Sequence, residues 1–171
     1  MTVVTTTATV LDDVLVDGLD IVFCGTAAGH TSARAKQYYA GPGNQFWTTL
    51  HVIGLTPRQL RPSEFRELLG YGIGLTDVCK HASGNDDDLE RTDFDVDGFW
   101  RRIDDHRPRI VAFNGKQAAK SALRLQTVAY GPQGTTAGGV AVFVLPSTSG
   151  AARGHWDIAY WHDLARRLDR H

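Results

Sequence analysis

The segment that decides the fold reads Ile21-Val22-Phe23-Cys24-Gly25-Thr26-Ala27-Ala28-Gly29. Its first four residues form a short apolar run that a glycine stops, which is typical of a buried β-strand. The following residues, 25–43, are rich in Gly and Ala and contain Pro42, so they predict a long loop. Long loops inside compact domains usually carry function. We therefore expect a buried strand whose carboxyl end leads directly into a functional loop.

Outward from this segment, strands and helices are predicted to alternate. Further apolar runs predict short strands at 73–78, 109–113 and 140–145. Apolar spacing and capping residues predict helices at 44–54, 62–69, around 99–103, 116–125 and 157–170. Continuous apolar strands are usually covered on both faces. We therefore predict an α/β fold, a three-layer sandwich with a central, mostly parallel four-stranded sheet, whose site lies beyond the carboxyl ends of the strands.

Length and composition set the remaining limits. The 171 residues are expected to form a single domain, 1–171, with a Thr-rich, loosely ordered tail at 1–18. No apolar run is long enough to span a bilayer, and no secretory signal is evident. Cys24 and Cys79 form no disulfide framework and no zinc-ligand spacing, so no metal or cofactor is expected. We expect a monomer in the cytoplasm, associated with the nucleoid and not with a membrane.

The net charge of −1 conceals an uneven distribution of charge. Residues 83–105 hold nine acids and three arginines, whereas residues 106–156 hold six Lys and Arg residues and no acid. A local basic surface of this kind favours binding to a nucleic acid backbone. Chance clustering of charges on solvated faces explains the pattern equally well.

Four loops at the expected strand ends carry the unusual residues. Gly25–Gly29 allows close approach of backbone to a ligand, although it matches neither a P-loop nor a dinucleotide fingerprint. Tyr38 and Tyr39 offer aromatic faces for stacking on a base. The turn at Asn114-Gly115-Lys116 and the small-residue loop 147–154 suit phosphate groups. Each feature also has a plain structural explanation: a tight turn, core aromatics, a solvated cap lysine and a flexible loop.

Asp77 ends the strand predicted at 73–78, and it is the only acid between Glu67 and Asp86. A carboxylate in this position, beside three loops that suit a ligand, is a candidate general base. The alternative is an aspartate that only caps the strand. Neither cysteine has an adjacent histidine that could activate it, and we expect Cys24 to be a core residue.

In their order along the chain, these loops resemble the uracil-DNA glycosylase superfamily, and specifically its mismatch-specific uracil and thymine-DNA glycosylase branch. The resemblance runs from about Ile21 to Leu168. It rests on Gly25 to Trp47, which ends as Asn44-Gln45-Phe46-Trp47, and on Phe113-Asn114-Gly115-Lys116, Tyr130-Gly131-Pro132-Gln133 and Leu145-Pro146-Ser147-Thr148-Ser149-Gly150.

The resemblance implies an enzyme that flips a nucleotide out of DNA and hydrolyses its N-glycosidic bond. It implies a base pocket formed by Thr26, Ala27, Ala28, Ser32, Tyr39 and Asn114. Tyr39 matches the stacking aromatic of the family, and Ser32 matches a position where uracil-preferring members carry serine. The implied DNA contacts are Lys116, Ser147, Thr148, Ser149, Gly150, Ala151 and Arg153.

Several positions depart from the pattern of the branch. Ala27 stands where the catalytic asparagine is expected, and Ala28 replaces a proline. Ala151 is too small to plug a duplex, and Ser147 stands where other branches carry an electrophilic histidine. Our hypothesis is that Asp77, which lies where relatives place a base-reading side chain, takes over catalysis.

Two other functions are compatible with the sequence. A DNA-binding module that recognises deaminated bases without cleaving them is favoured by Ala27, whereas Asp77 favours an active glycosylase. An α/β hydrolase acting on free nucleosides is the third hypothesis. The acid-free stretch 106–156 and the small-residue loop argue for a polymeric substrate instead.

Overall fold

The computed structural model describes residues 9–84, 89–90 and 93–168. Its sheet has the strand order β2-β1-β3-β5-β4. Four strands are parallel: β1 (Ile21–Gly25), β2 (Ile73–Asp77), β3 (Ile110–Asn114) and β5 (Ala141–Leu145). These strands are the ones that the apolar runs predict. The predicted fold class is confirmed, but the sheet has five strands and not four.

The additional strand, β4 (Gly131–Thr135), pairs antiparallel with β5 at the edge of the sheet. Its sequence Gly-Pro-Gln-Gly-Thr has none of the β-branched or aromatic residues that signal a strand, apart from its terminal threonine. Proline is tolerated there because one side of an edge strand needs no partner for its amide groups. The register is irregular between Pro132 and Gly134, and only the neighbouring strand makes this segment extended.

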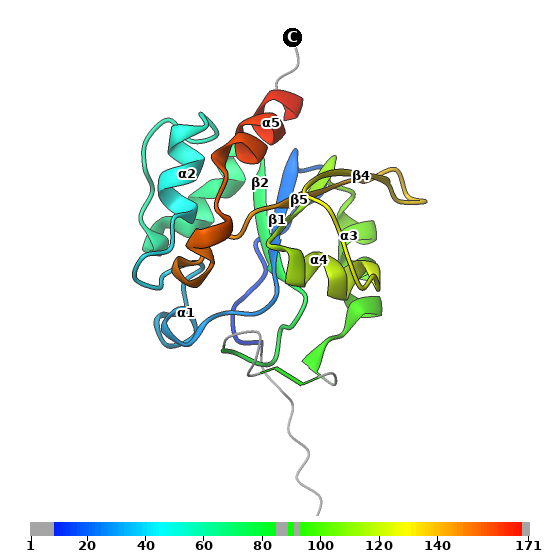
Figure 1. The fold of residues 1–171 in the computed structure, drawn as a ribbon, viewed down its shortest axis with the longest axis horizontal. Helices are drawn as coiled ribbons and strands as arrows, with labels where there is room; N and C mark the ends of the chain where they lie inside the picture. Colours follow the sequence, from blue (N-terminus) through cyan, green and yellow to red (C-terminus); the bar gives the residue numbers. More distant parts are fainter. Residues whose placement is uncertain (1–8, 85–88, 91–92, 169–171) are drawn as a thin grey trace, which may run out of the picture.

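Helices cover both faces of the sheet (Figure 1). On one face lie α2 (Phe46–Val52), the 3-10 helix η1 (Pro62–Tyr71) and α5 (Ile158–Leu168). On the other face lie α3 (Val96–His106) and α4 (Lys116–Leu123). Alternate strand residues serve the two layers: Ile21 and Phe23 pack with the first group, and Val22 and Cys24 with the second. Cys24 is a core residue, as predicted.

Two short helices interrupt segments that the sequence predicts as loops. α1 (His30–Ala35) lies within 25–43, and the 3-10 helix η4 (Gly150–His155) lies within 147–154 and extends one residue beyond it. Neither is long enough to show helical periodicity in the sequence. The N-cap residue of α2 is Gln45, and the side-chain oxygen of the preceding Asn44 accepts a hydrogen bond from the Phe46 amide at 3.0 Å.

The N-terminal segment 9–18 is packed against the sheet, contrary to the prediction of a loose tail. Leu11 and Val14 are buried, and Val14 forms an antiparallel bridge with Leu75 of β2. The Val10 amide donates to the Lys80 carbonyl at 2.7 Å. Residues 1–8, which the same prediction includes, lie outside the described residues.

Candidate active site

A pocket of about 820 Å³ opens at the carboxyl ends of the parallel strands. The four predicted loops meet there because parallel strands present their carboxyl ends at one edge. Every site residue predicted from the sequence lines this pocket, except Arg153. The sequence did not point to His30 and His155, which also line it, and it pointed to Tyr130 only as part of the motif Tyr130-Gly131-Pro132-Gln133. The sheet topology therefore brings together residues from four separate parts of the chain.

The loop Gly25–Gly29 is held against the segment that follows β2. The Val78 amide donates to the Gly25 carbonyl at 3.0 Å, and the Cys79 amide to the Thr26 carbonyl at 2.7 Å. The Gly84 amide donates to the Ala28 carbonyl at 2.9 Å. These bonds give the loop a defined shape at the pocket wall. The Ala27 side chain there is a methyl group that can neither hold a water nor carry a proton.

Asp77 is the acidic residue of the pocket, and it is only 4% exposed. Burial raises the pKa of its carboxyl group to about 6, and the charge of Asp13 adds to that effect, while Lys80 and Arg102 oppose it. A carboxyl group with this pKa is largely ionised at neutral pH and can still accept a proton. These are the properties that a general base requires.

Tyr39 forms an aromatic wall of the pocket. Its ring stacks on Phe46 with a centroid separation of 4.1 Å and an interplanar angle of 29°. Its backbone φ of 53° is a strained conformation for a residue other than glycine, and such strain is often found at functional sites. The Tyr39 hydroxyl is buried and has no hydrogen-bond partner within the described part of the chain. The neighbouring Tyr38 is a core aromatic that donates to the Asp12 carbonyl at 2.9 Å.

Ser32 is buried at the pocket wall. Its hydroxyl oxygen accepts a hydrogen bond from the Ala40 amide at 2.9 Å, which ties α1 to the loop that carries Tyr39. The side chain is therefore fixed in position, with one acceptor site already used.

Asn114 and Thr148 form a reciprocal pair across two loops. The Asn114 amide nitrogen donates to the Thr148 hydroxyl at 2.9 Å, and the Thr148 backbone amide donates to the Asn114 side-chain oxygen at 3.0 Å. Both side chains are buried. The Gln45 amide, just before α2, donates to the Thr148 carbonyl at 2.9 Å. Asn114 therefore holds the loop after β5 in place, a role that the sequence did not predict.

The small-residue loop is ordered by its own hydroxyl groups. Ser147 accepts from the Ser149 amide at 3.1 Å, and Ser149 accepts from the Ala151 amide at 3.2 Å. Arg153, outside the pocket lining, donates to the Gly43 carbonyl at 3.2 Å and ties η4 to the loop before α2. These hydrogen bonds give the loop a defined conformation at the rim of the pocket.

Lys116 lies at the start of α4, where backbone amides favour anions. Its Nζ atom lies 4.3 Å from the centroid of the Tyr130 ring, which also lines the pocket. This contact holds a positive charge at the pocket mouth, and the exposed Arg153 adds a second one on the rim.

A hollow of about 700 Å³ lies apart from the strand ends, between α3 and α4. The acids and bases that line it are not buried, and Asp97 pairs there with Arg124 at 2.8 Å. It lacks the buried titratable group and the convergence of strand ends that define the first pocket. The chemistry is therefore assigned to the first pocket.

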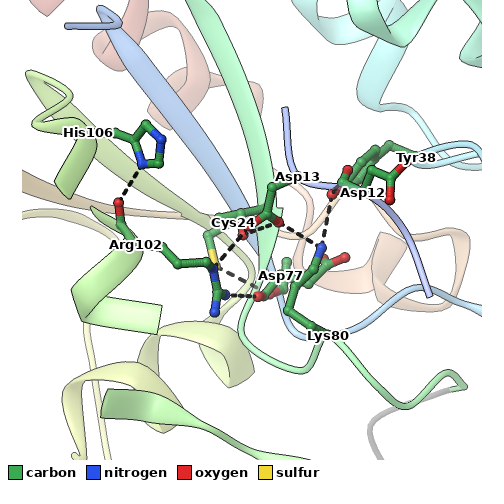
Figure 2. Close-up of polar contacts among 10 residues, drawn as sticks. Asp12, Asp13, Cys24, Tyr38, Asp77, Lys80, Arg102 and His106 are labelled. Atoms are coloured by element: carbon green, nitrogen blue, oxygen red, sulfur yellow. Dashed lines mark hydrogen bonds and ion pairs between the residues drawn. The ribbon is translucent and has the colours of Figure 1, made fainter. Parts of the chain in front are cut away.

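Behind Asp77 lies a group of charged side chains that the sequence did not connect (Figure 2). Asp13, Lys80 and Arg102 come from the N-terminal segment, the segment after β2 and α3. No sequence signal pointed to Asp13, because the segment that carries it was predicted to be a tail.

Within the described part of the chain, no group of three His, Cys, Asp or Glu side chains could hold a metal ion. Among the helices described, none is both long and apolar enough to cross a membrane.

The fold and the pocket define an α/β protein with a candidate site at the carboxyl ends of its parallel strands. A family model described as the uracil DNA glycosylase superfamily matches residues 13–165. The chain therefore belongs to the uracil DNA glycosylase superfamily. Membership supports a DNA glycosylase, a hydrolase of DNA repair that binds DNA as its substrate.

The chain is also similar to a solved structure, determined in solution by NMR, of a candidate uracil DNA glycosylase from Methanosarcina acetivorans. The two are 27% identical, with a TM-score of 0.67. The similarity covers 94% of this chain and 97% of the other.

Proposed function

We propose that this protein excises uracil from DNA and that Asp77 is the catalytic carboxylate. The observation that carries the proposal is the position of Asp77: a buried carboxylate at a strand end, in a pocket that also contains the Tyr39 ring. Excision requires the nucleotide to be flipped out of the stack and its base held between side chains. The ring of Tyr39, fixed by its stacking on Phe46, provides a platform for the flipped pyrimidine.

Asp77 supplies the charge that the reaction needs. The C1′–N1 bond breaks, and its electron pair leaves with the base as an anion. A water oxygen then bonds to C1′, and a proton of that water passes to Asp77. While the bond breaks, the carboxylate also balances the positive charge that develops on the sugar. The backbone amides of Thr26–Ala28 are the donors that we assign to the anionic base.

The specificity that we propose within this reaction depends on two positions, Ser32 and Ala151. We place the chain in the mismatch-specific branch and expect it to prefer uracil over thymine, because the Ser32 side chain at the pocket wall is buried and carries a hydroxyl group. Ala151 is exposed and small, so it fills little of the gap left by a flipped base. We therefore expect no requirement for a particular opposite base.

The test is single-turnover excision on an oligonucleotide with one uracil, followed by alkali and detection of strand scission. Asp77→Asn should keep the pocket shape and DNA binding but lower the rate roughly 10²–10⁴-fold, the usual contribution of a general base. The matched control is Asp163→Asn, which removes a carboxylate that pairs with Arg166 and Arg167 at 3.5 and 3.3 Å on α5. The control should cleave at the wild-type rate. If Asp77→Asn excises uracil at the wild-type rate, Asp77 only caps the end of its strand and is not the catalytic residue.

The Ala27 methyl group favours a second candidate, a module that binds deaminated bases without cleaving them. The same experiment separates the two: this module would bind the uracil oligonucleotide tightly and produce no alkali-labile site. Ala27→Asn discriminates further, because it restores a side chain that can orient water and should retain or raise the rate of an active glycosylase.

A further inference from the structure

Three charged side chains on the inner side of Asp77 have no part in the reaction just described. Asp13, Lys80 and Arg102 are absent from the pocket lining, so we expect no contact between them and a bound substrate. Figure 2 shows them grouped around the Asp77 position, with Asp13 between the two cations. Buried charges are costly unless they are paired, so a group of this kind requires a physical reason.

Asp13 joins the two cations. Its Oδ1 atom lies 2.7 Å from Nζ of Lys80, and its Oδ2 atom lies 3.0 Å from Nε of Arg102. The Thr76 hydroxyl, one residue before Asp77, donates to the same Oδ1 atom at 2.7 Å. The Lys80 side chain is only 6% exposed, whereas those of Asp13 and Arg102 are 20% and 26% exposed.

Arg102 also holds the backbone of Asp77. Its Nη2 atom donates to the Asp77 carbonyl at 2.9 Å. The Arg102 carbonyl in turn contacts Nδ1 of His106 at 2.8 Å within α3. Lys80 reaches the opposite side, where its Nζ atom donates to the Tyr38 hydroxyl at 3.2 Å. The end of β2 is thus fixed from two directions.

We propose that Lys80 and Arg102 are positioning residues that keep the buried Asp77 carboxylate ionised and aligned, and that Asp13 holds both cations and limits their effect. The inference rests on the proposed function, because it assigns a purpose to the charge of Asp77. With Asp77 ionised, these four side chains carry two positive and two negative charges. Replacing Asp13, Lys80 or Arg102 by a neutral residue changes the net charge that surrounds the Asp77 carboxylate.

Three other titratable groups near Asp77 carry no charge near pH 7. Cys24 comes from β1, and Tyr38 and Tyr39 come from the segment after α1. Burial raises the pKa of all three well above their usual values. They therefore remain neutral near pH 7, and the local field at Asp77 is set by Asp13, Lys80 and Arg102.

The proposal predicts changes of opposite sign. Lys80→Met keeps the apolar stem but removes a cation, so the protonation midpoint of Asp77 should rise. Asp13→Asn keeps the shape but removes an anion, so the midpoint should fall. The midpoint should move by about one pH unit or more in each variant, as is typical of a charge at close range. A purely structural role would reduce stability without moving the midpoint in two directions.

The direct measurement is carboxyl-carbon NMR of aspartate-labelled protein as a function of pH, with the Asp77 signal assigned by its loss in Asp77→Asn. Lys80→Arg, which keeps the charge, should titrate close to wild type. Arg58→Gln is the matched control, because Arg58 pairs with Glu64 on the surface at 2.9 Å, and it should leave the midpoint unchanged. If Lys80→Met fails to fold, the fall expected in Asp13→Asn still decides the question. The proposal would be overturned if the Asp77 midpoints of Lys80→Met and Asp13→Asn both equalled the wild-type midpoint, or if both moved in the same direction.

Activity measured across the same pH range separates this inference from the proposed function. If the acidic limb of uracil excision follows the NMR midpoint in each variant, both stand. If the NMR midpoints move as expected but excision does not follow them, the network is correct and Asp77 is not the catalytic carboxylate. In the third outcome, the acidic limb of excision lies at the NMR midpoint of Asp77, but the variants of Asp13 and Lys80 leave that midpoint unchanged. Asp77 is then the catalytic carboxylate, and the proposed role of the charged network is wrong.

Discussion

The carboxylate of Asp77 occupies the space that a side chain on Gly25 would need, because a β-carbon on Gly25 would lie 2.7 Å from its Oδ1 atom. The two residues are register partners at the ends of β1 and β2. The same β-carbon would lie 3.3 Å from the Tyr39 hydroxyl. The glycine that stops the first apolar run is therefore required by the space that Asp77 and Tyr39 occupy, and not by an unusual backbone conformation.

Gly25→Ala should displace Asp77 and lower both stability and excision. Overpacking of a filled site costs about 1–3 kcal/mol, and the lost alignment of the carboxylate should reduce the single-turnover rate further. Gly70→Ala is the control, because Gly70 is exposed on η1, outside the pocket lining, and a β-carbon there would meet no atom within 4 Å. Urea unfolding and excision assays measure the two effects. Equal stability and activity in the two variants would show that the space over Gly25 is not filled in solution.

The excision rate should depend on pH with a midpoint near the pKa of Asp77, which burial raises to about 6. The carboxylate is the active form, so the rate should rise with pH through this value and level off at neutral pH. The measurement is single-turnover excision with enzyme in excess, so that DNA binding does not limit the rate. A rate that is constant from weakly acidic to neutral pH would argue against a carboxylate catalyst.

Asp77→Asn should stabilise the fold at neutral pH. The pKa of Asp77 is higher in the folded chain, at about 6, than the ordinary value of 3.8. Between these two pKa values the folded state binds a proton at Asp77 that the unfolded state does not bind. The free energy of unfolding of the wild type therefore falls as the pH rises from the unfolded pKa through the folded pKa. A tenfold difference in proton affinity corresponds to about 1.4 kcal/mol, so we expect a gain of about 1–3 kcal/mol at neutral pH. The gain should disappear in acid, which urea unfolding at both pH values tests.

Asn114→Ala should loosen the rim of the pocket. It removes both hydrogen bonds to Thr148 and leaves a buried backbone amide without its partner, which costs about 1–3 kcal/mol. Combining it with Thr148→Val should cost less than the sum of the two single changes, because the pair acts as one unit. A double-mutant cycle by urea unfolding measures the coupling. Strict additivity would show that the two residues stabilise the loops independently.

Ser32→Ala should raise thymine excision relative to uracil excision. In the proposed base pocket the Ser32 hydroxyl group would crowd the C5-methyl group of thymine, and its removal would open that space at the expense of the bond to the Ala40 amide. The readout is the ratio of single-turnover rates on G·T and G·U duplexes, which cancels any general loss of activity. An unchanged ratio would place the discrimination elsewhere in the pocket.

Much of the fold was predictable because its signals are local. The runs that became β1, β2, β3 and β5 are continuous apolar segments with turn residues after them, and such strands are buried wherever they pair. The convergence of their loops into one pocket follows from parallel topology alone. β4 could not be predicted in this way, because its extended conformation comes from pairing with β5 and not from its own Gly- and Pro-containing sequence.

Some features of the site were likewise predictable from local sequence, and others depended on tertiary packing. The order of residues along the chain was enough to place Asp77 and the loops 25–43 and 147–154 at strand ends, because each closes or follows a predicted strand. Tyr39 comes to the site as part of the first of these loops. The packing of distant segments was needed to bring Asp13 between Lys80 and Arg102 behind Asp77. Thr76 and Asp13, which share a hydrogen bond, are 63 residues apart, and no periodicity marks either one. Local pattern reports which face of an element is buried, whereas the partner of a buried charge depends on which distant segment packs against it.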